Sequence, residues 1–222
     1  MNVVVSGGSV QVEVWSDVVC PWCYIGKRRL ERALEEFEHA GRVRVLWRSF
    51  QLDPSFPEGV GEPVYDALAR KTGSSREQVR AMTGQVTQVA AEEGLDYDFA
   101  GGVMVNTFDV HRVLHLARER GLEERAHERF MRAQLVQARD LSDADTLVEV
   151  ATEVGLEGRE VRGVLAGSEY AESVRADVAA ARELGATGVP FFVMERAFGF
   201  SGVQPVEVFV AALDKAYRAG RG

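Results

Sequence analysis

The feature that most constrains the fold is a pair of cysteines at the junction between a predicted strand and a predicted helix. The pair is Cys20-Pro21-Trp22-Cys23, and the chain of 222 residues contains no other cysteine. Residues 10–14 alternate apolar and polar side chains, which is typical of a strand. Apolar residues then recur at helical spacing, which predicts a helix to about residue 38. Proline suits a first helical turn, so Cys20 is predicted at the helix N-terminus and Cys23 one turn further in.

This placement favours thiol–disulfide exchange. The unpaired N–H groups and the positive dipole end of a helix N-terminus stabilise a thiolate there. The positive charge of Lys27, one turn beyond, is expected to add to this effect. Residues three apart share a helix face and can approach to disulfide distance. We therefore interpret Cys20 as the attacking thiolate and Cys23 as the thiol that resolves a mixed disulfide.

Three other uses of the cysteines compete with this interpretation. A structural disulfide across so short a loop would remove little entropy from the unfolded chain. Half of a zinc site is another use, because His111 and His115 supply a His-x3-His spacing. Two inert core thiols would not need a proline between them. We expect a redox pair and no bound metal, because such a pair beside a strand–helix unit is typical of redox proteins.

Composition narrows the class of protein. The net charge of −8 argues against a nucleic-acid partner, and no apolar run is long enough to span a membrane. Hydrophobic content of 46% and charged content of 27% are ordinary for a globular protein. Residues 1–8 lack the basic and apolar regions of a secretory signal and are predicted to be a flexible lead-in. With two cysteines only, the expected compartment is the cytoplasm.

The order of the predicted elements indicates the fold class. A second strand at 42–48 completes a β-α-β unit with parallel strands. From residue 63 to about 184 the signals are helical, including a capping box at Ser74-Ser75-Arg76-Glu77 and a helix over 122–139. Strands at 189–194 and 197–200, joined by a turn at Glu195-Arg196, precede a helix that Pro205 opens.

The order β-α-β, helical segment, β-β-α predicts an α/β protein with the thioredoxin fold and a large all-helical insertion. The predicted thioredoxin-like domain is discontinuous, at 9–61 and 185–218, and the helical insertion subdomain covers 62–184. No fixed-period repeat relates the inserted helices, so a solenoid is not expected.

Several separated motifs carry a family resemblance. They are Asp17-Val18-Val19-Cys20-Pro21-Trp22-Cys23-Tyr24-Ile25-Gly26-Lys27, Val105-Asn106-Thr107 with His111-Arg112, Arg139-Asp140-Leu141, and Gly188-Val189-Pro190-Phe191-Phe192. Over nearly its whole length the chain resembles the FrnE branch of the DsbA-like thioredoxin superfamily. The resemblance implies a dithiol–disulfide oxidoreductase. Some FrnE proteins carry a second cysteine pair near the C-terminus, and this chain lacks it.

The resemblance also implies roles for residues outside the cysteine pair. It implies that the Val189–Pro190 bond is cis and faces Cys20, which adds Pro190 to the catalytic residues. A proline there offers no N–H, and the backbone of Val189 stays free to pair with an extended substrate. The alternative is that Pro190 only starts the strand. Trp22, together with Pro21, is expected to affect the stability of the thiolate, and Trp22 is also expected to contact the substrate. The alternative is that Trp22 only packs against the rest of the protein.

The remaining candidates each have two interpretations. Asp17 either accepts a proton or orients the turn, or else it only hydrogen-bonds the loop backbone, as Asx residues commonly do. Asn106 and Thr107 are most simply a helix cap, although the resemblance implies that this helix start borders the substrate cleft. His111 and His115 share a helix face and are expected to be a hydrogen-bonded, partly buried pair, with His111 also a candidate for substrate binding or proton transfer. His127 lies among charged residues and is expected to be solvated.

The predicted activity is protein disulfide oxidoreductase, acting on a disulfide in a protein or a small molecule. No tightly bound cofactor is expected, and glutathione or a partner redoxin is the candidate for recycling the pair. One alternative is a glutathione-dependent isomerase or transferase acting on an aromatic or polyketide small molecule, because the superfamily that the chain resembles includes such enzymes; they typically carry serine where this chain has Cys20. The other is a non-catalytic zinc-binding or holdase protein. The expected assembly is a monomer or a homodimer.

Overall fold

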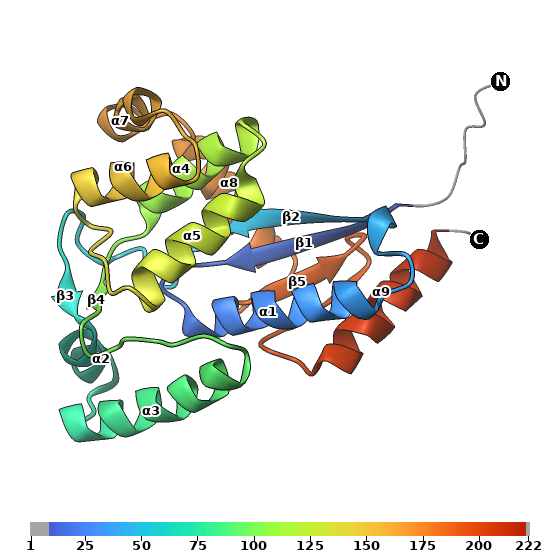
Figure 1. Cartoon of the computed structure of the whole chain (residues 1–222), viewed down its shortest axis with the longest axis horizontal. Coiled ribbons are helices and arrows are strands. Elements are labelled where there is room, and N and C mark those ends of the chain that lie inside the picture. Colours follow the sequence, from blue (N-terminus) through green and yellow to red (C-terminus); the bar gives the residue numbers. More distant parts are fainter. Residues whose placement is uncertain (1–8, 221–222) are drawn as a thin grey trace.

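Figure 1 shows the computed structural model, which describes residues 9–220. The lead-in predicted at 1–8 lies outside the described residues. The strands are β1 (Val10–Ser16), β2 (Val43–Ser49), β3 (Glu62–Pro63), β4 (Val103–Met104), β5 (Phe191–Met194) and β6 (Phe198–Ser201). The α-helices are α1 (Pro21–Glu36), α2 (Val64–Thr72), α3 (Arg76–Glu92), α4 (Phe108–Glu119), α5 (Glu123–Leu135), α6 (Ala144–Glu153), α7 (Gly158–Ala166), α8 (Ala171–Glu183) and α9 (Val206–Ala219).

A four-stranded mixed sheet forms the centre of the molecule, in the order β2-β1-β5-β6. Strands β1 and β2 are parallel, with Val10 opposite Val43, while β5 pairs antiparallel with both β1 and β6. The parallel pair is joined through α1, and β5, β6 and α9 follow the inserted helices. This arrangement confirms the predicted fold class, an α/β thioredoxin fold with a helical insertion.

The two faces of the sheet are covered by different helices. Helices α1 and α9 pack on one face, where Val12 and Phe192 meet Leu30 of α1 and Phe209 of α9 in one apolar core. On the other face, Trp15 packs with Ala181 of α8. Successive side chains of a strand point to opposite faces, so β1 supplies both cores from neighbouring residues.

The inserted helices enclose a third apolar core beyond one end of the sheet (Figure 1). Cys23, Tyr24 and Ile25, from the first turns of α1, are buried in this core together with Val110 of α4 and Phe130 of α5. The N-terminus of α1 is therefore held between the sheet and the inserted helices. No helix among residues 9–220 is both long enough and apolar enough to cross a membrane.

The element bounds differ from the prediction in several places. Strands β3 and β4 pair antiparallel within the stretch expected to be purely helical, and strands of two residues have no periodicity to detect. Helix α5 ends at Leu135 and not near residue 139, because Ala138 takes a positive φ of 51° that a helix cannot include. Helix α1 ends at Glu36, two residues before the predicted position.

The turn between β5 and β6 confirms the predicted hairpin. Glu195 and Arg196 both have positive φ, 53° and 52°, as a two-residue turn that follows the twist of the strands requires. The side chain of Arg196 reaches back to Glu13 of β1, with Nε 2.7 Å from Oε2. This ion pair ties the turn to the sheet at a position where glycine would be the usual residue.

The capping box at the start of α3 lies one residue later than predicted. Ser75, and not Ser74, accepts a hydrogen bond from the N–H of Gln78, and the Gln78 side chain accepts one from the N–H of Ser75. We expect Ser75→Ala to lower the free energy of unfolding by about 1 kcal/mol, because one N–H at the helix start loses its acceptor. Urea denaturation measures the loss. Ser74→Ala is the matched control, and equal losses from both variants would contradict this register.

Candidate active site

The two cysteines lie at the N-terminus of α1, as predicted. Cys20 is the N-cap residue and Pro21 is the first residue of the helix. Both cysteines are free thiols, and their side chains lie 3.4 Å apart. Both are buried, with exposed fractions of 3% for Cys20 and 1% for Cys23, but only Cys20 lines a cavity. A disulfide substrate entering the cavity therefore meets Cys20 first.

The segment before β5 faces the cysteine pair. The Val189–Pro190 peptide bond is cis, as the resemblance implies. The thiol of Cys20 points to the carbonyl oxygen of Val189, with Sγ 3.6 Å from the oxygen. Gly26 allows this close approach, since a Cβ on it would lie 3.2 Å from both Pro190 Cγ and Phe192 Cζ. Pro190 and the cysteines thus belong to one compact site.

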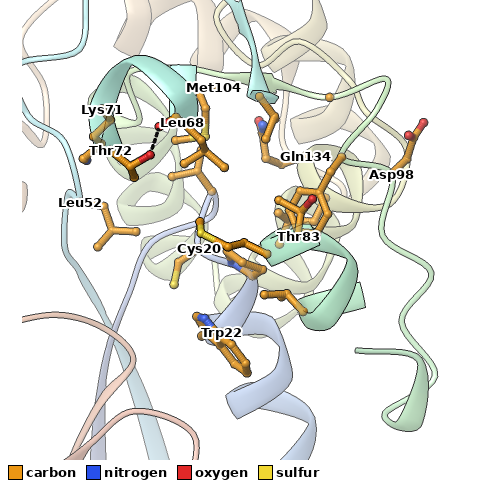
Figure 2. Close-up of a pocket in the computed structure, with 18 of the residues that line it drawn as sticks. Cys20, Trp22, Leu52, Leu68, Lys71, Thr72, Thr83, Asp98, Met104 and Gln134 are labelled. Carbon is orange, nitrogen blue, oxygen red and sulfur yellow. Dashed lines mark hydrogen bonds between the residues drawn. The ribbon is translucent and has the colours of Figure 1, made fainter. Parts of the chain in front are cut away.

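A cavity of about 410 Å³ opens beside Cys20 (Figure 2). Its walls come from the start of α1, from α2 and α3, and from β4 and α5. Pro21 and Trp22 also line it, and the Trp22 side chain is 39% exposed. Packing therefore does not cover the whole Trp22 side chain, and its contact with a substrate stays a prediction.

The environment of Cys23 suits a thiol that reacts second. Burial raises the pKa of Cys23 well above its ordinary value, and a hydrogen bond to Cys20 and the charge on Cys20 raise it further. The two contributions from Cys20 are lost once Cys20 forms a mixed disulfide. Cys23 therefore becomes easier to deprotonate at the step in which it must attack.

Asp17 holds the loop that follows β2. Its Oδ2 accepts a hydrogen bond of 2.8 Å from the Leu52 N–H, which lies in the loop after β2 and not in the turn that contains Asp17. Its Oδ1 is buried without a hydrogen-bond partner among the described residues and lies 3.4 Å from Nε2 of His111. The same His111 nitrogen lies 2.9 Å from the carbonyl oxygen of Phe50. Asp17 and His111 therefore form a buried polar pair.

Asn106, Thr107 and His111, the predicted substrate-binding side chains, do not line the cavity beside Cys20. Asn106 donates to the carbonyl oxygen of Phe56 at 2.6 Å, and its Oδ1 accepts from the Phe108 N–H at 2.9 Å. Asn106 is thus the helix cap, while the Thr107 side chain makes no capping bond. Asn106 and His111 are thus bonded within the protein, and none of the three side chains is placed to contact a substrate in this cavity.

The histidines do not come together as metal ligands. Nε2 of His115 lies 3.2 Å from both Ser49 Oγ and Asp177 Oδ2, so His115 is a buried hydrogen-bonded residue. His127 was expected to be solvated, which is wrong. Its ring stacks on Trp47 with 4.8 Å between ring centroids, and burial lowers its pKa well below the ordinary value. Among residues 9–220, no three His, Cys, Asp or Glu side chains are grouped so as to hold a metal ion.

Comparison with known proteins assigns this site to a family. The model of the DsbA-like thioredoxin domain matches residues 11–214, which is nearly the whole chain. The chain belongs to the DsbA-like thioredoxin family. A crystal structure of a "probable DsbA oxidoreductase", SCO1869 from Streptomyces coelicolor, is 47% identical with a TM-score of 0.90, and the match covers 94% of this chain and 90% of that chain.

Two more distant relatives are similar over most of the chain. YwbO of Bacillus subtilis, described as an uncharacterized protein, is 28% identical over 84% of this DsbA-like chain and 87% of its own length. The cytosolic disulfide reductase DsbM of Pseudomonas aeruginosa, solved with glutathione, is 20% identical with a TM-score of 0.62, covering 94% and 99% of the two chains. At that identity the DsbM structure shows a shared fold only.

One contact between the insertion and helix α1 of this DsbA-like protein was not predicted from the sequence. The hydroxyl of Tyr97, in the loop after α3, donates a hydrogen bond of 2.7 Å to the carbonyl oxygen of Pro21. The ring of Tyr97 also stacks with that of Tyr24, with 6.3 Å between centroids. Burial, and then the charge of Cys20, raise the pKa of Tyr97, so its hydroxyl remains a donor. No local pattern marks a tyrosine in a loop for such a contact.

A charged cluster lies on α1 beyond the cysteines. Lys27 is 2% exposed and pairs with Glu31 and with Glu128 of α5, the latter at 2.9 Å. Glu128 also accepts hydrogen bonds from Tyr24 and Arg28. Burial alone would raise the pKa of Glu128, but the hydrogen bonds and the nearby cations outweigh it and lower the pKa to about 2. The cluster fixes α1 to the insertion.

Proposed function

We propose that this protein is a dithiol–disulfide oxidoreductase in which Cys20 attacks and Cys23 resolves. The observation that carries the proposal is the geometry of the pair: side chains 3.4 Å apart, both buried, with only Cys20 in the wall of the cavity. Membership of the DsbA-like family and the 47% identity to an oxidoreductase described as DsbA support it. The FrnE branch and the cytoplasm remain the predicted subfamily and compartment.

The reaction balances in two steps. The Cys20 thiolate attacks one sulfur of the substrate disulfide, forms a mixed disulfide and releases the other sulfur as a thiolate. Cys23 then loses its proton and attacks Cys20, which forms the Cys20–Cys23 disulfide and releases the second substrate thiolate. The protein gives up two electrons and the substrate gains them. In the oxidising direction the same steps run in reverse.

A redox titration tests the proposal. The protein is equilibrated in glutathione and dithiothreitol buffers of graded potential, free thiols are trapped, and the mass is read. We expect one reversible two-electron transition. Its midpoint potential assigns the direction of electron flow, because the reduction potentials of oxidants and reductants with this fold differ by roughly 150 mV. A pair that stays reduced across all buffers would contradict the proposal and favour the glutathione-dependent isomerase or transferase.

A further inference from the structure

The loop between α3 and β4 crosses beside the start of α1 (Figure 1) and places one hydroxyl group against its backbone. The hydroxyl of Tyr97 donates a hydrogen bond of 2.7 Å to the carbonyl oxygen of Pro21, which lies between the two cysteines. A carbonyl oxygen has two acceptor sites, so this bond does not compete with hydrogen bonding inside the helix. The insertion therefore contacts the Cys-Pro-Trp-Cys segment through a directed polar bond as well as by packing.

The position of the Tyr97 hydroxyl is fixed by the packing of its loop. The N–H of the next residue, Asp98, donates to the carbonyl oxygen of Leu135 in α5 at 2.9 Å. The Tyr97 ring stacks with Tyr24, and it meets the Phe99 ring edge-on with 5.6 Å between centroids. Tyr97 is 6% exposed, so its side chain is already ordered before any reaction at the cysteines.

The Pro21 carbonyl shares its peptide unit with the N–H of Trp22. Proline has no N–H, so the Trp22 N–H is the first that α1 presents. The side chain of an N-cap residue accepts a hydrogen bond from the second or third helical N–H. The third, that of Cys23, donates to the carbonyl oxygen of Cys20 at 3.0 Å. A thiolate at Cys20 is therefore expected to take its hydrogen bond from the Trp22 N–H.

A hydrogen bond accepted at one end of a peptide unit strengthens the donor at its other end. Bonds linked in this way polarise one another, by about 10–30% per bond. The Cys20 thiol makes no capping bond and points instead to the carbonyl oxygen of Val189 at 3.6 Å. The chain from Tyr97 to Cys20 is thus completed only after the thiol loses its proton, and it favours the thiolate over the thiol.

We propose that Tyr97 is a positioning residue that stabilises the Cys20 thiolate through the Pro21–Trp22 peptide unit. The helical insertion then sets the reactivity of the cysteine pair, in addition to enclosing the cavity. This inference rests on the proposed function in one respect. A stabilised thiolate favours the reduced pair and makes the protein a stronger oxidant.

Alkylation by iodoacetamide tests the inference without disulfide chemistry. In Cys23→Ser protein Cys20 is the only thiol, and the alkylation rate is measured between pH 3 and pH 9. We expect Tyr97→Phe, made in this protein, to move the midpoint of the pH profile upward by about half a unit. Below the midpoint this corresponds to about threefold less thiolate. An unchanged profile, with a thermal unfolding curve showing that the variant is folded, would overturn the inference.

Other ionisable groups near Tyr97 do not account for such a shift. Cys23, Tyr24 and Arg28 act on Tyr97 together with Cys20. Cys23 is absent from the test protein, and burial followed by the hydrogen bond to Glu128 raises the pKa of Tyr24. The guanidinium of Arg28 stays charged throughout. Of these groups, only Cys20 therefore changes its charge in the measured range.

Tyr24→Phe is the matched control. It removes a hydroxyl from the ring that stacks on Tyr97, but this hydroxyl donates to Glu128 at 2.6 Å and not to the Cys-Pro-Trp-Cys segment. We expect the control to leave the midpoint of the alkylation profile unchanged. Equal shifts in the two variants would contradict a role of the bond to Pro21, because the loss of either hydroxyl would then have the same effect.

The reduction potential is the second readout, measured on protein with both cysteines. We expect Tyr97→Phe to favour the disulfide about threefold more, which places the midpoint about 15 mV lower at roughly 30 mV per tenfold change. A higher midpoint would contradict the inference. An unchanged alkylation profile overturns the role of Tyr97 and leaves the two-electron transition standing, whereas a missing transition overturns the proposed function and leaves the alkylation result standing.

Discussion

Replacing Cys20 by serine is expected to reduce disulfide exchange to the uncatalysed background, while Cys23→Ser stops the reaction at the mixed disulfide. A serine hydroxyl at the cavity wall stays protonated and is a poor nucleophile toward sulfur. With Cys23 removed, Cys20 still attacks, but no thiol lies within reach to release the adduct. Mass spectrometry after addition of a small aromatic disulfide measures both results: no adduct on Cys20→Ser, and one stable adduct on Cys23→Ser.

This pair of variants shows which of the two thiols attacks the substrate first. The position of Cys20 in the cavity wall and the raised pKa of Cys23 both assign the first attack to Cys20. An adduct on Cys20→Ser protein would reverse the assignment. Full turnover by Cys23→Ser would favour an enzyme that needs one cysteine only, which is the glutathione-dependent alternative.

Glu128→Gln is expected to cost about 2 kcal/mol of unfolding free energy at pH 7, because it leaves the buried Lys27 and its neighbour Arg28 with one carboxylate fewer. This figure is discounted for solvent screening, since the Glu128 side chain is 31% exposed. The folded-state pKa of Glu128 is about 2, lower than its usual value of 4.5. The stabilisation is therefore fully present above about pH 4.5 and is lost as pH falls toward 2.

Urea denaturation of the wild type and the variant between pH 7 and pH 2 measures this dependence. The two stability curves should differ most at neutral pH and converge in acid. Glu35→Gln is the control, because Glu35 is exposed on the same helix and forms no ion pair within residues 9–220. A constant difference between wild type and Glu128→Gln across this range would show that titration of Glu128 does not contribute to stability.

The local parts of the site were predictable because they depend on neighbours in the chain. A valine-rich alternating strand, a proline in the first helical turn and cysteines three apart place Cys20 as the N-cap residue. The capping of α4 by Asn106 and the hairpin at Glu195-Arg196 follow from similarly short patterns. Ser74 and Ser75 are equally suitable as the N-cap residue of α3, and the predicted capping box was therefore wrong by one residue.

Other features depend on which distant segments pack together. The charged residues near His127 in the sequence indicated solvent, yet the fold stacks its ring on Trp47. Tyr97 reaches Pro21 across 76 residues of chain, and no periodicity records that contact.

The sequence by itself therefore determined the fold class, the placement of the cysteine pair and the family, since periodicity, helix capping and cysteine spacing act over a few residues. Only the tertiary structure decided which residues enclose the cavity and which buried polar groups lack a partner. Gln134 Oε1, for example, is buried without a hydrogen-bond partner among residues 9–220. Burial and hydrogen-bond pairing are properties of the packed chain, and they are set when segments distant in sequence come into contact.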